Sequence, residues 1–576
     1  MNGEDHFHLR PGKIRSKGSQ RTRPVIAQAL AAARRAGGHV SRKGRIVSPG
    51  RSTFGRGRAA SLRATHRIGR NARQVIIKAR VVRHGGRSSL ARHLDYLQRE
   101  GVTRDGDKGV LFGVDQDRID SADFAGRCED DRHHFRFIVS PEDASEIGDL
   151  KTFTRDLMTQ MEKDLGTQLD WTGVAHWNTD NPHVHIIVRG VADDGQNLVI
   201  SRDYIREGMR GRASEIVTRE LGLRTEQDIG RALERQVDAE RWTDIDRDLA
   251  RTMQQGGMID VAPVAGEPPG GESAVRIGRL RKLEGLGLAS EIAPGQWTLH
   301  GDAEPALRAL GERGDIIKRM HRAMSERGIE RSAASFALEV EPNRPVMGRL
   351  VERGLHDELS GTAYAIVDGI DGRTHHVELP DIEASGDCCP GSIVELRRFE
   401  DRKGRQRVAL ALRSDMELSG QVTAPGATWL DHRNLSGDRR DLGGGFGADV
   451  RQALDARAQH LADEGLAWRQ GRRIVFARNL LDTLQRRDLD AVAEKLSGEI
   501  GLPHRPSQAG DYVMGTVRQR LALSSGRYAM IDNGLGFQLV PWTPSLDRQM
   551  GKHISGVMRG DGGVDWSFGR GRGLGL

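Results

Sequence analysis

The chain has 576 residues, which predicts several domains, and its 37% hydrophobic content includes no apolar run of about 18 residues that would suggest a membrane span. The net charge of +8 is uneven: residues 1–70 hold 17 Lys and Arg against two acids, +15, so the rest of the chain carries −7. Three cysteines exclude a disulfide framework, and the N-terminus lacks the apolar core of a signal peptide, so we expect a protein of a reducing cytoplasm.

Residues 1–70 are rich in Arg, Gly and Ser and show little hydrophobic periodicity, which predicts a mostly disordered basic arm. Such an arm suits a polyanion, most often nucleic acid. The alternative is a solvated extension without a function.

The first packed domain is expected over residues 71–232. Its apolar patterns alternate between strand and helix periods, which predicts helices packed on an antiparallel sheet, an α+β fold. The expected elements are a strand at 74–82, a helix at 88–101, a strand at 133–143, a helix at 149–166, strands at 169–177 and 182–190, and a helix at 201–222.

Beyond residue 232 the patterns are weaker. Residues 233–335 suggest a helical, winged-helix-like module, 336–415 a small β-rich, barrel-like module, and 416–576 a mixed helical and β region with a flexible basic end. No internal repeat of convincing period is evident.

Three histidines, His176, His183 and His185, fall within ten residues. Residues two apart in a strand share a face, so His183 and His185 point the same way, with an apolar face behind them. Antiparallel pairing across the polar loop brings His176 beside His183, and three imidazoles with open positions form a catalytic type of metal site. Nitrogen ligands suit Mn, Zn, Ni or Co, and Mg less readily. The alternative is a group of surface histidines gathered by chance.

Tyr96 lies about 120° from the leucine stripe of its expected helix, on a face with Arg92, His93 and Arg99. A tyrosine among basic residues can meet a phosphate, and an activated tyrosine can act as a covalent nucleophile. On this pattern alone an ordinary surface tyrosine is the alternative.

Three segments in order resemble the motifs of conjugative relaxases, the HUH-type single-strand DNA endonucleases of plasmid mobilisation and Ti-plasmid border nicking. HLDYLQREG resembles the first motif with its nucleophilic tyrosine, FIVSPEDA the second, which ends at Ser140 near the DNA, and HWNTDNPHVHIIV the histidine motif. The match covers roughly residues 73–230, and the long remainder resembles the C-terminal part of one relaxase subgroup. One departure is Asn178, where many members have Asp; Asp180 in the same loop is the candidate substitute.

The resemblance implies an HUH relaxase fold and a relaxase that nicks one strand at the origin of transfer of a plasmid or integrative element. By that resemblance Tyr96 is the nucleophile, His176, His183 and His185 hold a divalent ion (Mg or Mn, with Zn as the alternative), and a 5′-phosphotyrosyl adduct forms before the strand is rejoined. The implied partners are single-stranded and duplex DNA, relaxosome accessory proteins and a type IV secretion coupling protein, with export alongside the DNA.

Residues 71–230 carry 23 basic against 28 acidic side chains, so local basic groups such as Arg92 and Arg99, together with the arm, are expected to attract phosphate. Three alternatives stay open. They are a rolling-circle replication initiator, a non-catalytic DNA-binding protein with a structural histidine metal site, and an unrelated metallohydrolase.

Overall fold

The computed structural model describes two compact units, one up to Gly230 and one from Arg231 onward, and each is considered by itself. Most of the expected arm, Asp180 and the C-terminal end lie outside the described residues. The described residues are 39–40, 46–47, 56–57, 71–83, 87–179, 181–262, 271–338, 346–400, 404–437, 439–471 and 473–568.

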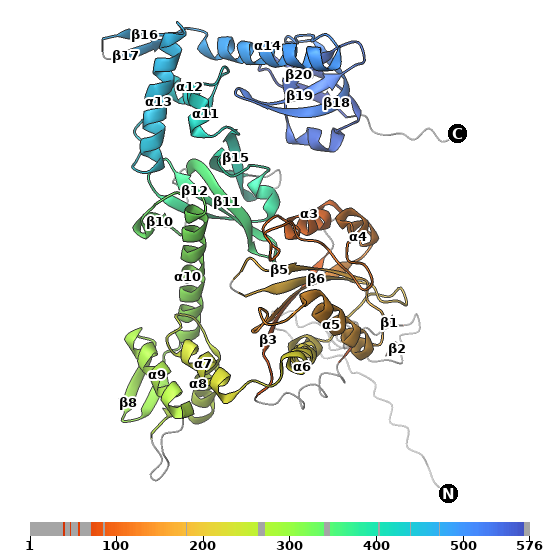
Figure 1. Ribbon diagram of the computed structural model, residues 1–576, viewed down its shortest axis with the longest axis vertical. Coiled ribbons are helices and arrows are strands. Elements are labelled where there is room, and N and C mark those ends of the chain that lie inside the picture. Colours follow the sequence, from red (N-terminus) through yellow and green to blue (C-terminus); the bar gives the residue numbers. More distant parts are fainter. Residues whose placement is uncertain are drawn as a thin grey trace, which may run out of the picture. The chain divides into compact units, whose positions relative to one another are not determined.

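The first unit is built on a four-stranded antiparallel sheet in the order β3-β4-β6-β5 (Figure 1). The expected α+β class is therefore confirmed. The four strands are β3 (Val75–Arg83), β4 (His133–Pro141), β5 (Trp171–His176) and β6 (His183–Arg189).

One face of this sheet packs on two long helices, α5 (Leu150–Leu165) and α6 (Met209–Leu221), which form its main core. Alternate residues of β6 supply the sheet side of that core, and their apolar faces are buried as the sequence predicts. Helix α5 begins at Asp149, whose carboxylate accepts two backbone N–H groups, and ends at Gly166 in the left-handed conformation. The core residues from β6 are Val184, Ile186 and Val188.

The opposite face is covered by α3 (Arg87–Leu97) and α4 (Ser121–Arg127), which pack on β5 and β6. Helix α4 has only seven residues, too short for a helical period to stand out in the sequence. Phe124 anchors it in this second core, and Asp120 caps its N-terminus.

Three short pieces of the expected arm are described, at residues 39–40, 46–47 and 56–57. Two-residue strands β1 (His39–Val40) and β2 (Ile46–Val47) pair with each other. Arg56 is held against the first unit, since its N–H donates to Val199 O at 2.7 Å and its guanidinium reaches Asp194. The arm is therefore anchored at Arg56, a contact that composition does not predict.

The second unit contains two consecutive copies of the same order of helices and strands. This internal repeat corrects the expectation that the chain has none. Both copies have three helices, a β-hairpin, a long helix and five antiparallel strands, and the first copy has two further short strands, β7 and β10. The first copy runs α7 (Glu226–Val237), α8 (Asp244–Gly256), β7 (Ile259–Asp260), α9 (Gly271–Gly285), β8 (Ala289–Ala293), β9 (Gln296–Leu299), α10 (Ala303–Ser325), η2 (Ala333–Ser335), β10 (Phe336–Ala337), β11 (Met347–Asp357), β12 (Thr362–Gly369), β13 (Thr374–Leu379), η3 (Ile382–Ser385), β14 (Ile393–Glu400) and β15 (Gln406–Ser414).

The second copy follows directly and has the same strand order. Strands β20-β19-β18-β21-β22 match β13-β12-β11-β14-β15, and a 3-10 helix separates the third and fourth strands of each copy. The second copy runs α11 (Leu418–Val422), α12 (Trp429–Ser436), α13 (Phe446–Asp463), β16 (Ala467–Gln470), β17 (Arg473–Phe476), α14 (Leu480–Ile500), β18 (Tyr512–Leu523), β19 (Gly526–Asp532), β20 (Phe537–Pro541), η4 (Pro544–Gln549), β21 (His553–Met558) and β22 (Val564–Ser567).

A fully buried arginine marks the same place in both copies. Arg279 of α9 pairs with Asp246 and donates to three carbonyls ahead of α8; Arg457 of α13 does the same with Asp431. Each aspartate also closes a capping box at the start of its helix. The residues that surround the arginine are identical in the two copies at a spacing of 185 positions. In the first copy they are Val237, Ala239, Thr243 and Asp246, and in the second Val422, Ala424, Thr428 and Asp431.

Strands β7, β9 and β8 form a three-stranded sheet, and they share a core with α8 and α9. The winged-helix-like character expected for this region stays a prediction. The strands expected to be barrel-like form an open six-stranded sheet with β10 and β15 at its edges. In the described part of the chain, no helix is both long and apolar enough to cross a bilayer.

Candidate metal centre and nucleophile

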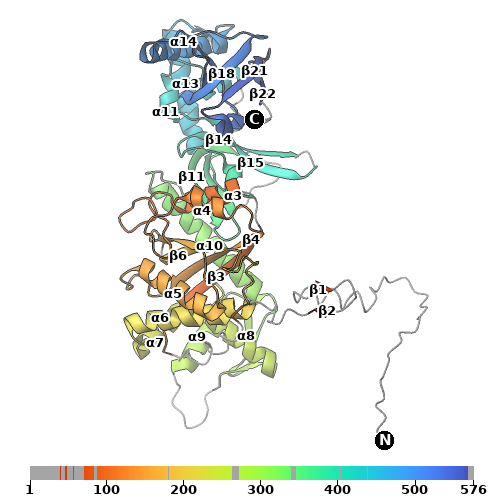
Figure 2. The same cartoon turned by 90° about the vertical axis from the view of Figure 1, so that its right-hand side faces the viewer.

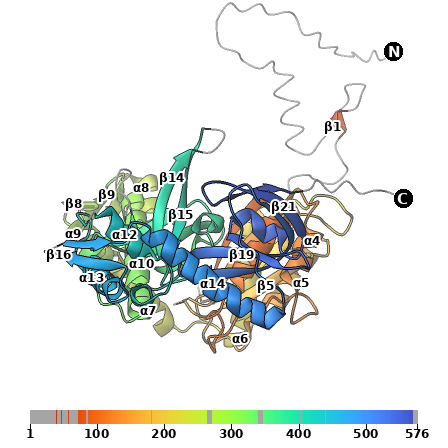
Figure 3. The same ribbon diagram turned by 90° about the horizontal axis from the view of Figure 1, so that it is seen from above.

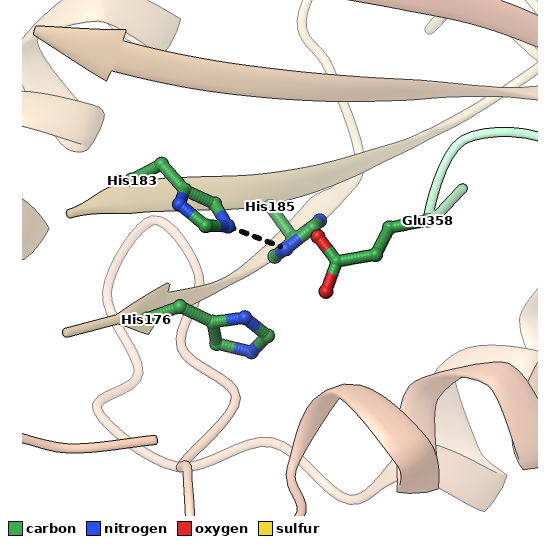
Figure 4. Close-up of side chains that lie close together, drawn as sticks. All are labelled: His176, His183, His185 and Glu358. Atoms are coloured by element: carbon green, nitrogen blue, oxygen red, sulfur yellow. Dashed lines mark hydrogen bonds between the residues drawn. The ribbon is translucent and has the colours of Figure 1, made fainter. Parts of the chain in front are cut away.

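The paired strands β5 and β6 bring the three histidines together (Figure 4). The register sets His176 directly opposite His183 and Val174 opposite His185, the pairing expected from the sequence. The three rings lie on the α3 side of the sheet, with centroids 4.5–5.4 Å apart. Each ring offers one nitrogen within 4.8 Å of the others.

A backbone carbonyl fixes the ring of His176. Its Nε2 lies 2.7 Å from the carbonyl oxygen of Leu97, the last residue of α3. A carbonyl oxygen only accepts hydrogen bonds, so in the neutral ring Nε2 carries the proton and Nδ1 carries the lone pair. A partner of this kind sets the tautomer and orientation of a metal-binding histidine.

His183 is oriented in the same way. Its Nδ1 lies 2.9 Å from the carbonyl oxygen of Asn181, so Nδ1 donates and Nε2 carries the lone pair. That Nε2 lies 3.1 Å from Nε2 of His185. Two nitrogen ligands about 2.1 Å from one ion stand about 3.0 Å apart in octahedral geometry and about 3.4 Å apart in tetrahedral geometry. The separation therefore fits two ligands of a single divalent ion.

Tyr96 lies on α3, immediately before the residue that anchors His176. It is half-buried against the leucine stripe of its helix, so it is less exposed than the sequence suggests. The guanidinium of Arg99 lies 4.5 Å from the centre of its ring. His93, expected on the same open face, is buried.

The segment after α3 is tied to the end of β5. Trp177 N donates to Val102 O at 2.7 Å, and the guanidinium of Arg104 lies 3.7 Å from the Trp177 ring. These contacts hold the C-terminal end of α3 beside His176.

The other candidate residues are more dispersed. Arg92 is exposed on α3, and Asn178 is exposed in the loop between β5 and β6. The Ser140 hydroxyl donates to Pro182 O at 3.3 Å, which places it beside the start of β6. Asp180 lies outside the described residues.

Three basic residues that the sequence reasoning missed share the face of the histidines. Lys78 of β3 pairs with Ile138, which in turn opposes His185, and Arg80 pairs with Arg136 on the neighbouring strand. Lys78 and Arg80 are exposed, whereas Arg136 is buried. The alternation of QVIIKARVV could have placed Lys78 and Arg80 on one face, but only the register shows that this is the histidine face.

Burial of Arg136 and the nearby charge of Arg80 lower the pKa of its guanidinium to about 10, so it stays protonated at neutral pH. Its Nε donates to Nε2 of His134 at 3.1 Å. The β3–β4 part of this face is thus cationic, and α3 and α4 pack on the β5–β6 part.

With the sheet, its two helical layers and the histidine cluster described, the comparison with protein families identifies a relaxase nuclease domain in the first unit. The family described as Relaxase, MobA/VirD2-like, nuclease domain matches residues 114–223, which include the three histidines and begin after Tyr96. The chain belongs to the family described as a protein of unknown function (DUF3363), which matches residues 276–406 and 396–575, together more than half of the chain. No curated protein and no solved structure matches it.

Proposed function

We propose that the protein nicks one DNA strand at the origin of transfer of a plasmid or integrative element by tyrosine transesterification. One observation carries the proposal. The histidine cluster is hydrogen-bonded, through His176, to the carbonyl of Leu97, the neighbour of Tyr96. A candidate nucleophile and a candidate metal centre thereby belong to one rigid arrangement.

In the proposed reaction the hydroxyl of Tyr96 attacks the scissile phosphorus in line. A bond forms between phosphorus and the tyrosine oxygen, and the bond to the 3′ oxygen breaks. The tyrosine proton is lost and the 3′ oxygen gains one, which leaves a free 3′-OH and a 5′-phosphotyrosyl link. One phosphodiester replaces another, so the step is reversible and the same site can rejoin the strand.

The residues around Tyr96 have distinct proposed roles. His176, His183 and His185 hold a divalent ion, Mg or Mn, with Zn as an alternative; when bound it supplies Lewis-acid polarisation of the scissile phosphate. Arg99 places a positive charge beside the tyrosine ring, where it favours loss of the hydroxyl proton by stabilising the phenolate.

We propose that the single strand crosses the β3–β4 part of the histidine face. Lys78, Arg80 and Arg136 supply positive charge there, although the domain as a whole is acidic. Ser140, Arg92, Asn178 and Asp180 remain candidate contacts or helpers.

Three further features belong to the same proposal. Accessory proteins assemble with the relaxase at the origin, and a type IV secretion coupling protein receives it from the bacterial cytoplasm. The basic arm at 1–70 holds duplex DNA, and its deletion is expected to weaken DNA binding and flatten the salt dependence.

The experiment is adduct formation on labelled single-stranded oligonucleotides that tile the candidate origin of transfer, with Mn²⁺ or Mg²⁺, resolved on a denaturing gel. We expect a covalent protein–DNA band that is lost in Tyr96→Phe and with EDTA. Tyr204→Phe is the matched control, because Tyr204 is the other tyrosine of this unit and is buried in the opposite core, donating to Asp164.

Other outcomes discriminate between the alternatives. Cleavage without an adduct would indicate a metallohydrolase. An adduct that persists in Tyr96→Phe would exclude Tyr96 as the nucleophile. If no oligonucleotide of a tiling that contains the cognate site is cut, the protein is a DNA-binding protein with a structural metal site.

A further inference from the structure

The hairpin of β14 and β15 differs from its counterpart in the second copy. Strand β14 pairs with β11 only as far as Glu395, and one further backbone bond joins Leu396 N to Val346 O. From Arg397 outward, the pairing of β14 within the part of the chain that the structure describes is with β15, through the rung of Glu400 and Gln406. This outer part, named here the ribbon, extends away from its sheet (Figure 2).

The counterpart hairpin in the second copy, β21 and β22, is shorter. Strand β21 is paired with β18 through the rung of Val557 and Tyr512, and Met558 N still donates to Asp511 O. β14 runs five residues past the rung of Met347 and Glu395, whereas β21 runs three residues past the matching rung of Met514 and Ser555. The longer β14–β15 hairpin is visible again from above in Figure 3.

Charge separates the two hairpins as well. Residues 397–407 contain six Lys and Arg against two acids, a net charge of +4. The aligned stretch of the second copy, residues 556–566, contains one Arg and two Asp, a net charge of −1. A longer and basic hairpin is expected to meet a polyanion.

The register places an aromatic ring between two of these charges. Phe399 opposes Arg407, and two residues earlier Arg397 opposes Ala409, so all three larger side chains lie on one face of the ribbon. The side chain of Phe399 is 50% exposed, so it is not part of a hydrophobic core. Glu395 lies 3.5 Å from Arg397 and also pairs with Arg413.

We propose that the ribbon is a duplex-DNA-binding arm, in which Arg397 and Arg407 contact backbone phosphates and Phe399 contacts the groove. The inference rests on the proposed DNA-nicking function and gives the second unit a role in it. A two-stranded ribbon fits the major groove of B-DNA, which is about 12 Å wide. Exposed apolar side chains on DNA-binding elements also contact or wedge between base pairs.

The test measures the affinity of the full-length protein for a fluorescent duplex by anisotropy, in EDTA so that no strand is cut. The variant is Arg397→Glu/Arg407→Glu. The control, Arg322→Glu/Arg486→Glu, makes the same charge change at exposed helical positions of the same unit. We expect Kd to rise roughly tenfold in the ribbon variant, and the slope of log K against log salt to fall by about 2, since each lost phosphate contact removes about 0.9.

Equal Kd values for the ribbon variant and its control would overturn the proposal. So would a loss of affinity for a single strand of the same sequence with duplex affinity unchanged. Phe399→Ala is expected to weaken duplex binding without altering the salt slope, because the lost contact is apolar; binding as tight as in the wild type would remove Phe399 from the site.

Adduct formation on a single-stranded oligonucleotide with Mn²⁺ is measured in parallel. We expect the ribbon variant to retain it, because Tyr96 and the histidines are untouched. A wild-type protein that forms no adduct would count against the proposed nicking, and the duplex affinities would still decide the ribbon's role.

Discussion

Lys78 and Arg80 are the residues that best test the path of the single strand. Both are exposed on β3, on the face that carries the histidines. We predict that Lys78→Gln/Arg80→Gln weakens single-strand binding and lowers its salt slope by about 1.4, since each phosphate contact contributes about 0.7 on a single strand. Lys151→Gln/Lys163→Gln on α5, which packs on the opposite face, is the control; equal losses would place the strand elsewhere.

His376 is a buried histidine that is expected to lower the stability of the second unit at acidic pH. It stacks on Tyr364 in the second unit, and within the described part of the chain neither of its ring nitrogens has a hydrogen-bond partner. Burial first, and then the charges of Arg319 and His356, lower its pKa from 6.5 to about 4. The unfolded chain therefore binds the proton more readily, and stability falls as the pH drops from about 6.5 to about 4.

We predict that His376→Leu makes the second unit more stable in acid. The wild type is expected to lose about 3 kcal/mol over that pH range through this one group. The stability gap between variant and wild type, measured by urea denaturation, should widen as the pH falls from 7 to 4. A gap that does not change with pH would show that His376 is not the titrating group.

At the scale of elements, the two buried arginines can be compared by making the same substitution at each. Arg279 and Arg457 each neutralise an aspartate in a site with no exposed surface, so removing either cation leaves a buried carboxylate without its partner. We predict that Arg279→Met and Arg457→Met each cost about 3–5 kcal/mol of unfolding free energy. Arg308→Met, which breaks an exposed pair with Glu304, should cost less than about 1 kcal/mol.

Chemical denaturation of the three variants measures these losses of unfolding free energy. Similar losses in the two buried variants would support one architecture used twice. A small loss at only one of them would show that the copies no longer depend on the same contact.

The sequence predicted the elements of the first unit well, because its strands and helices keep clean periods and clear caps. Strand alternation and the short loop after His176 were enough to anticipate the pairing with His183. Helix α4 was missed because seven residues carry too little periodicity. The burial of Tyr96 was underestimated, because a helical wheel gives the direction of a side chain but not the residues from other segments that pack against it.

The internal repeat escaped sequence reasoning for another physical reason. Buried positions tolerate exchange among apolar residues, so the copies keep few identities beyond the Arg–Asp pair, its capping threonine and the VMG that stands at the start of β11 and β18. The correspondence between the two copies is therefore visible in the order and pairing of their strands, although few of their residues are identical.

At the scale of the whole molecule, the two units have separate cores, so each can respond to a ligand on its own. A divalent ion that binds only the folded histidine site stabilises the first unit by about 2.7 kcal/mol at a hundred times its Kd. We predict that Mn²⁺ raises one thermal transition in calorimetry and leaves the other unchanged. The shift should disappear in His183→Ala and persist in His375→Ala, since His375 belongs to the second unit and pairs with Asp371. A shift of both transitions would mean that the ion also binds the second unit or that the units unfold together, and a shift retained in His183→Ala would place the metal away from the histidine cluster.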